Sequence, residues 1–136
     1  MAGYSGRSLV EKLGIKPGTR IAILNAPRSY RVTLGSLPPG VVVASAARGT
    51  FPLIQFFTRS RSLLQAKLAM LLHALEPDGA LWISWPKKAS GVATDMTEDA
   101  VREIALPVGL VDIKVAAVDD VWSGLKLVRR LKTRPT

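Results

Sequence analysis

The segment Lys87-Lys88-Ala89-Ser90-Gly91 holds the residues whose types could most readily bind a ligand. Two ammonium groups, a hydroxyl and a glycine stand shortly before the start of a predicted helix. Backbone N–H groups beside lysine charges are suited to an anion such as phosphate. The same residues also fit a solvated loop in which Gly91 only allows a turn, and both interpretations stay open.

Three aspartates and a tryptophan are the other candidates for chemistry in the second half of the chain. Asp95 could act as a general acid or base, but its place just before a predicted helix favours a capping role. Asp119 and Asp120 are adjacent, so in an extended segment they point apart, and we interpret them as turn residues rather than a proton-sharing pair. Trp122, in the same polar turn, could stack on a ligand or cover the end of a hairpin.

Several common kinds of site are excluded by the residues that the chain lacks. It has no cysteine, which rules out disulfides, thiolate metal sites and a cysteine nucleophile. Its one histidine, His73, excludes a His-rich metal centre and is interpreted as a structural or surface residue. No Gly-x-x-x-x-Gly-Lys-Ser/Thr segment occurs, so a P-loop is excluded. The sequence therefore predicts no metal site.

Charge is distributed unevenly along the chain, whose formal net charge is +9. Residues 1–68 contain ten basic residues and one acid, Glu11, whereas residues 69–136 contain nine of each. The excess fits an anionic partner, namely a phosphate ligand, an acidic protein, a nucleic acid or a membrane surface. It also fits a solvated basic surface. Aromatic residues do not alternate with the basic ones, so nucleic acid is possible but not favoured.

The elements that must position these residues alternate between strands and helices. Short apolar runs predict buried strands at 20–24, 41–43, 52–57, 80–85, 112–118 and 125–131. Helices are predicted at 8–13, 28–34 and 62–76, with another that begins near Asp95 or Thr97. In the helix at 62–76, Ser62 and Gln65 fit a capping box. One face of that helix is apolar and is predicted to lie in the core, and it carries Leu64, Leu68, Leu71 and Leu75.

These elements predict one α/β domain over residues 1–136, with an N-terminal arm and short helix at 1–19 and a frayed tail at 132–136. Strands that are apolar on both faces indicate a mostly parallel sheet covered on both sides. The last two strands are joined too briefly for a parallel crossover, so they form an antiparallel hairpin. Ligands of such sheets bind at the carboxyl ends of the strands. The predicted ligand-binding residues there are Asn25, Arg28, Lys87, Lys88, Ser90, Gly91, Thr94, Asp95 and Trp122.

Two segments resemble class I S-adenosylmethionine-dependent methyltransferases. Residues 13–24, LGIKPGTRIAIL, look like the entry to the first strand of those enzymes. Residues 75–83, LEPDGALWI, look like a later helix-turn-strand, and the closing hairpin is also typical of them. The resemblance implies a Rossmann-like three-layer domain with about six strands. The whole chain is also similar to a family of small bacterial proteins classed as a domain of unknown function, through 3–6 (GYSG), 24–27 (LNAP), 85–91 (WPKKASG) and Asp119 with 122–125 (WSGL).

The chain departs from working methyltransferases at both of their cofactor anchors. Those enzymes place Gly-x-Gly after the first strand, where this chain has Asn25-Ala26-Pro27-Arg28. They place an acid at the end of the second strand, where this chain has Ala44-Ser45-Ala46-Ala47. The segment that follows is too short for another strand plus helix. No bound cofactor is therefore predicted.

The sequence favours a non-enzymatic binding module on a degenerate methyltransferase-like scaffold, which binds an anionic small molecule or a protein partner. One alternative is an unrecognised enzyme that uses Asn25, Lys87, Thr94 and Asp95. Another is a nucleic-acid-binding protein that uses the basic half. No apolar run is long enough to span a bilayer and no signal peptide is recognised, so a cytoplasmic protein is expected, with its oligomeric state left open.

Overall fold

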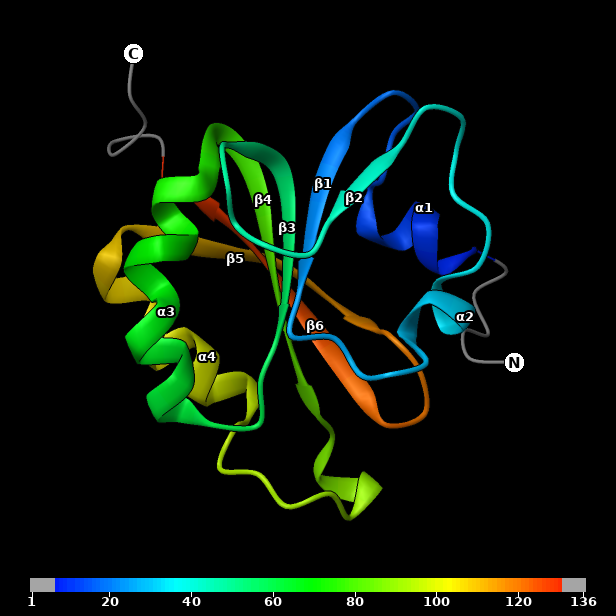
Figure 1. Ribbon diagram of the computed structural model, residues 1–136. Helices are drawn as coiled ribbons and strands as arrows, with labels where there is room; N and C mark the ends of the chain where they lie inside the picture. Colours follow the sequence, from blue (N-terminus) through cyan, green and yellow to red (C-terminus); the bar gives the residue numbers. More distant parts are fainter. Residues whose placement is uncertain (1–6, 131–136) are drawn as a thin grey trace.

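A computed structural model describes residues 7–130 of the chain and shows one six-stranded sheet (Figure 1). The strand order is β2-β1-β3-β4-β6-β5. Strands β2, β1, β3 and β4 are parallel, while β6 is antiparallel to both β4 and β5. The strands are β1 (Arg20–Leu24), β2 (Val42–Ala44), β3 (Phe51–Phe57), β4 (Leu75–Pro86), β5 (Leu110–Ala117) and β6 (Trp122–Arg129). The predicted mostly parallel sheet with a C-terminal antiparallel hairpin is confirmed.

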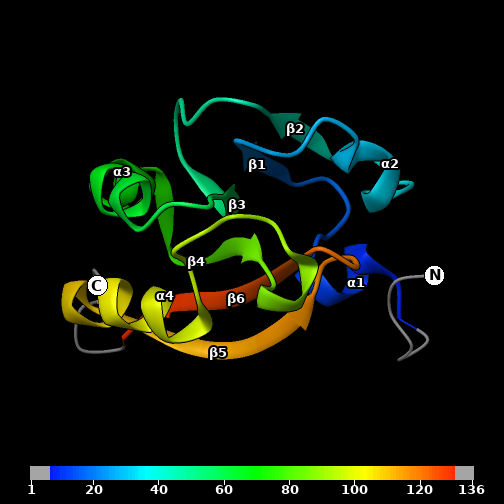
Figure 2. The ribbon, with the colours of Figure 1, turned by 90° about the horizontal axis from the view of Figure 1, so that it is seen from below.

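Helices cover the sheet on both faces (Figure 2). They are α1 (Leu9–Leu13), α2 (Tyr30–Leu34), α3 (Arg61–Ala74) and α4 (Glu98–Ala105), with short 3₁₀ turns η1 (Lys88–Ser90) and η2 (Leu106–Val108). Alternate residues of the central strands therefore enter two separate cores. Leu24, Phe56 and Ile83 pack with α3 and α4, whereas Ile23 and Phe57 pack with α1 and α2. This three-layer arrangement follows from strands that are apolar on both sides.

Helix α3 buries the predicted apolar face, with Leu64 and Leu71 fully buried and Leu68 nearly so. Its start differs from the prediction, because the N-cap is Ser60 rather than Ser62. The Ser60 hydroxyl accepts from the Leu63 N–H at 3.2 Å. Leu75 ends the helix and begins β4, so β4 starts five residues earlier than predicted. Residues 76–79 form an irregular bulge between the pairings of Leu75 with Phe51 and of Ala80 with Leu53.

The closing hairpin is tighter than the sequence suggested. Trp122, Ser123 and Gly124 were expected in the turn, but they pair in β6 with Pro86, Trp85 and Ser84 of β4. The turn itself is residues 118–121. The N–H of Val118 donates to the Trp122 carbonyl, so the turn closes there and β6 begins three residues earlier than predicted. The predicted frayed tail at 132–136 lies outside the described residues.

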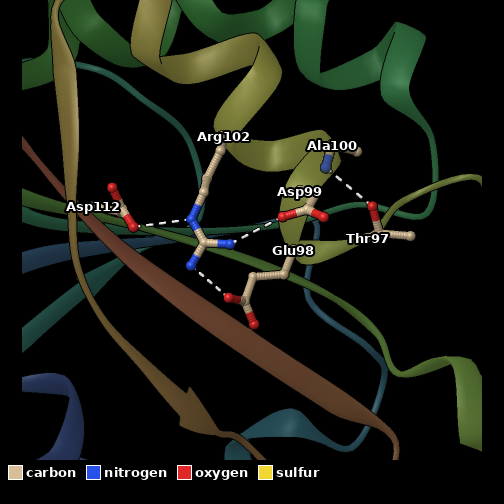
Figure 3. Close-up of polar contacts among 6 residues, drawn as sticks. All are labelled: Thr97, Glu98, Asp99, Ala100, Arg102 and Asp112. Atoms are coloured by element: carbon tan, nitrogen blue, oxygen red, sulfur yellow. Dashed lines mark hydrogen bonds and ion pairs between the residues drawn. The ribbon is translucent and has the colours of Figure 1, made fainter.

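An ion-pair cluster around Arg102 joins α4 to β5 (Figure 3). The Arg102 guanidinium donates to Asp112 at 2.9 Å, to Asp99 at 3.2 Å and also to Glu98. These partners raise the pKa of Arg102, and Arg102 in turn lowers the pKa of Asp112 below its usual value. Thr97 caps α4 by accepting from the Ala100 N–H at 3.0 Å.

Of the described helices, none has the length and apolar character needed to cross a membrane.

Candidate functional site

The carboxyl ends of the parallel strands meet at the lower edge of Figure 1, which we call the carboxyl edge. Residues that follow β1, β3 and β4 lie there, together with the turn of the closing hairpin. Strand β3 separates β1 from β4, so Asn25 and the Lys87–Gly91 segment follow strands that are not direct neighbours. The predicted site residues thus fall into groups with different surroundings.

Asn25 shapes the turn after β1. It is the one described non-glycine residue with a left-handed backbone, at φ 59°. Its side-chain amide donates to the carbonyl of Phe57, at the end of neighbouring β3, over 2.8 Å. Asparagine tolerates this backbone better than most residues, so it occupies a turn where the resembled enzymes use glycine. The amide thereby fastens the end of β1 to the end of β3.

The loop after β4 is joined to the hairpin turn. The Lys87 ammonium donates to the Asp119 carbonyl at 2.8 Å, and the Lys87 N–H donates to the Val121 carbonyl at 2.7 Å. The Ser90 hydroxyl donates to the Lys87 carbonyl at 2.6 Å, while Gly91 takes a left-handed backbone that ends η1. Lys87 and Ser90 therefore have structural partners, whereas Lys88 is exposed. An anion site in this loop stays a prediction.

Thr94 and Asp95 hold the start of α3. The Thr94 hydroxyl donates to the Arg59 carbonyl at 2.7 Å, and an Asp95 carboxylate oxygen accepts from the Arg61 N–H at 2.8 Å. The expectation that Asp95 caps the helix following it is wrong, because Thr97 caps α4. Asp95 instead satisfies the first turn of α3, since the loop from β4 passes that helix end before it enters α4.

Trp122 covers the core rather than standing free in a turn. It is half-buried, and its ring meets Phe57 edge-on at 5.1 Å between centroids. The Asp119 carboxylate accepts from the N–H groups of Val121 and Trp122, which is the turn role expected of it.

Arg28 is exposed, and neither a hydrogen bond nor an ion pair joins it to the described residues.

A pocket of about 310 Å³ opens between the carboxyl ends of β1 and β2 and the side of α3. It exists because residues 45–50 link β2 to β3 past β1 without a helix, although parallel crossovers usually contain a dozen or more residues. The lining is mostly apolar, with one cation and no acid. It consists of Leu24, Asn25, Ser45, Ala46, Ala47, Phe56, Leu63, Lys67 and Met70.

Sequence reasoning found Asn25 in this lining but missed the residues from α3. One signal was available, because the link between the second and third strands is too short to contain a helix. This signal does not place Lys67 and Met70 beside Ala46, because that requires knowing how α3 lies across the sheet. In the structure Met70 is 39% exposed.

The residues of this pocket do not fit S-adenosylmethionine as the resembled enzymes hold it. The end of β2 offers Ser45 and Ala46, so no carboxylate is present there to bind ribose hydroxyls. The turn after β1 contains no glycine, and the amide of Asn25 is bonded to Phe57. The donor set suits an apolar body with an anionic group better than a nucleoside.

A series of buried, hydrogen-bonded side chains lies below the carboxyl edge, on the face of the sheet that α2 covers. The Tyr30 hydroxyl donates to Gln55 at 2.6 Å, and the Gln55 amide donates to the Ser84 hydroxyl at 3.2 Å. Gln55 and Ser84 are fully buried, and burial raises the pKa of Tyr30 above its ordinary value. The sequence did not single out Gln55, although a glutamine inside the apolar run of β3 is a visible irregularity.

Within residues 7–130, no three His, Asp or Glu side chains gather as a metal site would require.

Several solved structures with a similar architecture are methyltransferases. A Sulfolobus solfataricus protein assigned to the type 11 methyltransferases matches with a TM-score of 0.66 and 14% identity, over 94% of this chain and 93% of that one. A SAM-dependent methyltransferase from Aquifex aeolicus matches with a TM-score of 0.61 and 14% identity, over 88% and 86% of the two chains. Magnesium protoporphyrin IX methyltransferase from Synechocystis, solved with bound SAM, matches with a TM-score of 0.56 and 12% identity, over 90% and 74%.

No protein-family model matches the chain, and no curated protein matches it either. At such low identity the structural likeness speaks for the fold alone. It covers most of this chain and most of the chains compared, so the resemblance first drawn from residues 13–24 and 75–83 is confirmed at the level of architecture. The chain therefore has the fold of class I S-adenosylmethionine-dependent methyltransferases.

Proposed function

We propose that this protein is a non-enzymatic binding domain on a methyltransferase-like scaffold. It takes a small molecule with an apolar body and an anionic group into the pocket between β1, β2 and α3. The composition of the lining carries the proposal, because apolar side chains and one lysine surround about 310 Å³ without any carboxylate. Ligand sites are commonly mostly apolar, with a few polar groups that fix orientation.

Lys67 is the charged group that would orient such a ligand. An ammonium about 4 Å from an anionic oxygen contributes roughly 1–4 kcal/mol of attraction, depending on the local dielectric. Leu24, Phe56 and Leu63 would contact the apolar body. The absence of acids from the lining means that nothing there repels an anion.

The carboxylates at the carboxyl edge form hydrogen bonds that stabilise the fold, and this supports a binding function without catalysis. Asp95 accepts from the first turn of α3, and Asp119 accepts from two N–H groups of the hairpin turn. General acid–base catalysis needs a positioned group that can exchange a proton with a substrate. Both carboxylates instead accept hydrogen bonds from backbone N–H groups, which is a structural role.

A SAM-dependent methyltransferase is the second candidate. The observation that favours it is the fold, which is shared over most of its length with enzymes of that class, one of them solved with bound SAM. The two candidates differ in the ligand that they predict, so binding experiments separate them.

Isothermal titration calorimetry with benzoate, indole-3-acetate and octanoate tests the proposed function. At least one probe should bind, and Lys67→Ala should weaken that binding about tenfold because it removes the cation of the pocket. Ala47→Leu should weaken it by filling the pocket. Lys12→Ala, on α1 at the other face of the sheet, is the matched control and should leave binding unchanged. Absence of binding by all three probes, or equal losses in Lys67→Ala and Lys12→Ala, would contradict the proposal.

A further inference from the structure

Acidic residues are distributed unevenly along the sequence, and in the folded protein they are distributed unevenly between the two halves of the sheet. No acid occurs between Glu11 and Glu76, and this stretch forms β1, β2, β3, α2 and α3. Since β2, β1 and β3 are consecutive neighbours, one half of the sheet and two of its helices are free of acidic side chains. The other half carries α4, with its acids Glu98, Asp99 and Glu103.

Basic residues in the two halves have different partners. In the half with acids, Arg102 is bonded to three carboxylates. In the acid-free half, most exposed basic residues form no ion pair with any residue in the described part of the chain. Among them are Arg28, Arg31, Arg48, Arg59 and Lys67. Acidic side chains of the described chain therefore do not neutralise these charges.

Three exposed cations follow strands that end at the carboxyl edge, and we call them the edge row. Arg28 follows β1, Arg59 follows β3 and Lys88 follows β4, and these strands are adjacent in the sheet. Neighbouring strands lie about 4.8 Å apart, so the turns that follow adjacent strands leave the sheet side by side along this edge. The fold brings three acids to this edge, namely Asp95, Asp119 and Asp120. The first two accept backbone N–H bonds, and Asp120 is exposed at the hairpin tip.

We propose that this row binds the phosphate backbone of a nucleic acid without reading its sequence. Two of its three members are arginines, whose guanidinium matches a phosphate with two parallel hydrogen bonds. The large apolar residues exposed in the described chain are Val32, Val42, Met70, Val108, Ile113 and Val115, and none lies in the turns after β1, β3 or β4. Interfaces with proteins usually contain an apolar core, so the edge suits a phosphate backbone better than an acidic protein.

This inference is independent of the proposed function, because none of the three residues lines the pocket. Fluorescence anisotropy of the full chain with a labelled 20-nucleotide RNA, a single-stranded DNA and a DNA duplex tests it. The variant is Arg28→Ala/Arg59→Ala/Lys88→Ala. Its matched control is Lys12→Ala/Lys16→Ala/Arg48→Ala, which removes the same charge from α1, the loop before β1 and the loop before β3. Circular dichroism melts of both variants verify folding.

The row variant should lose at least tenfold in affinity for one or more of the nucleic acids, while the control stays within about twofold. For a single strand, its slope of log affinity against log salt should fall by about 2, which corresponds to three lost phosphate contacts. Equal losses in both variants would overturn the proposal in favour of general attraction. No binding by the unmodified protein at low salt would also overturn it. Competition by polyglutamate as strong as by RNA would assign the edge to an acidic protein instead.

Discussion

Asn25 stabilises the turn after β1 in two ways, through its left-handed backbone conformation and through a side-chain hydrogen bond. The residue has φ 59° and donates to the Phe57 carbonyl. Asn25→Gly removes only the hydrogen bond, whereas Asn25→Ala also places a β-carbon in the left-handed region, which costs roughly 1–2 kcal/mol more. Urea denaturation should rank stability as unmodified protein, then Asn25→Gly, then Asn25→Ala. An alanine variant at least as stable as the glycine variant would show that the left-handed turn is not strained.

Tyr30 is the residue for which pH gives the sharpest test. Tyr30→Phe leaves the buried Gln55 oxygen without its donor and should cost about 1–3 kcal/mol at neutral pH. Burial raises the pKa of Tyr30 above 10.0, so above that pH the unfolded chain loses the proton while the folded protein retains it. The stability due to Tyr30 is present below about pH 10 and declines above it. Denaturation from pH 8 upward should show the gap between the two proteins narrowing above pH 10. A constant gap would contradict the burial of the hydroxyl.

At the scale of elements, the Arg102 cluster fastens α4 to β5. Asp112→Asn removes the acceptor on β5 and should lower the melting temperature at pH 7. Arg102 lowers the pKa of Asp112, so this contribution is present above the ordinary value of 3.8 and is lost as the pH falls below it. Melting temperatures of the two proteins should converge near pH 2. Glu103→Gln, which breaks an exposed pair at 3.6 Å, is the control and should change little. A difference that persists at pH 2 would show that the pair does not carry the effect.

The elements themselves could mostly be predicted from the sequence, because strands buried on both faces and turns rich in glycine and proline leave clear patterns. Strand β1 is predicted to the residue, and the helix before it ends at Gly14 as expected. Contacts between distant segments could not be predicted. Asp95 accepts from the first N–H of α3 rather than capping α4, and Trp122 pairs with Pro86. Both contacts depend on how the loop after β4 passes its neighbours.

At the scale of the whole molecule, the short link between β2 and β3 accounts for the pocket. The link contains no helix that would cover the ends of β1 and β2, so a pocket without carboxylates lies there beside α3. The sequence predicted which segments follow the strands at the carboxyl edge. It also showed that the chain lacks the glycine turn and the ribose-binding acid of methyltransferases, since both features can be read from the turns and the strand order. It could not predict the pocket, whose walls come from segments more than twenty residues apart, such as Ala46 and Lys67.

Titration of the unmodified protein with S-adenosylmethionine tests the central claim most directly, that this methyltransferase fold has lost the usual cofactor site. With neither a ribose-binding acid after β2 nor a glycine turn after β1, calorimetry should detect no binding tighter than about 1 mM, a free energy of roughly −4 kcal/mol. A dissociation constant in the low micromolar range, weakened by substitutions at Asn25 and Ser45, would contradict the claim and favour the methyltransferase candidate.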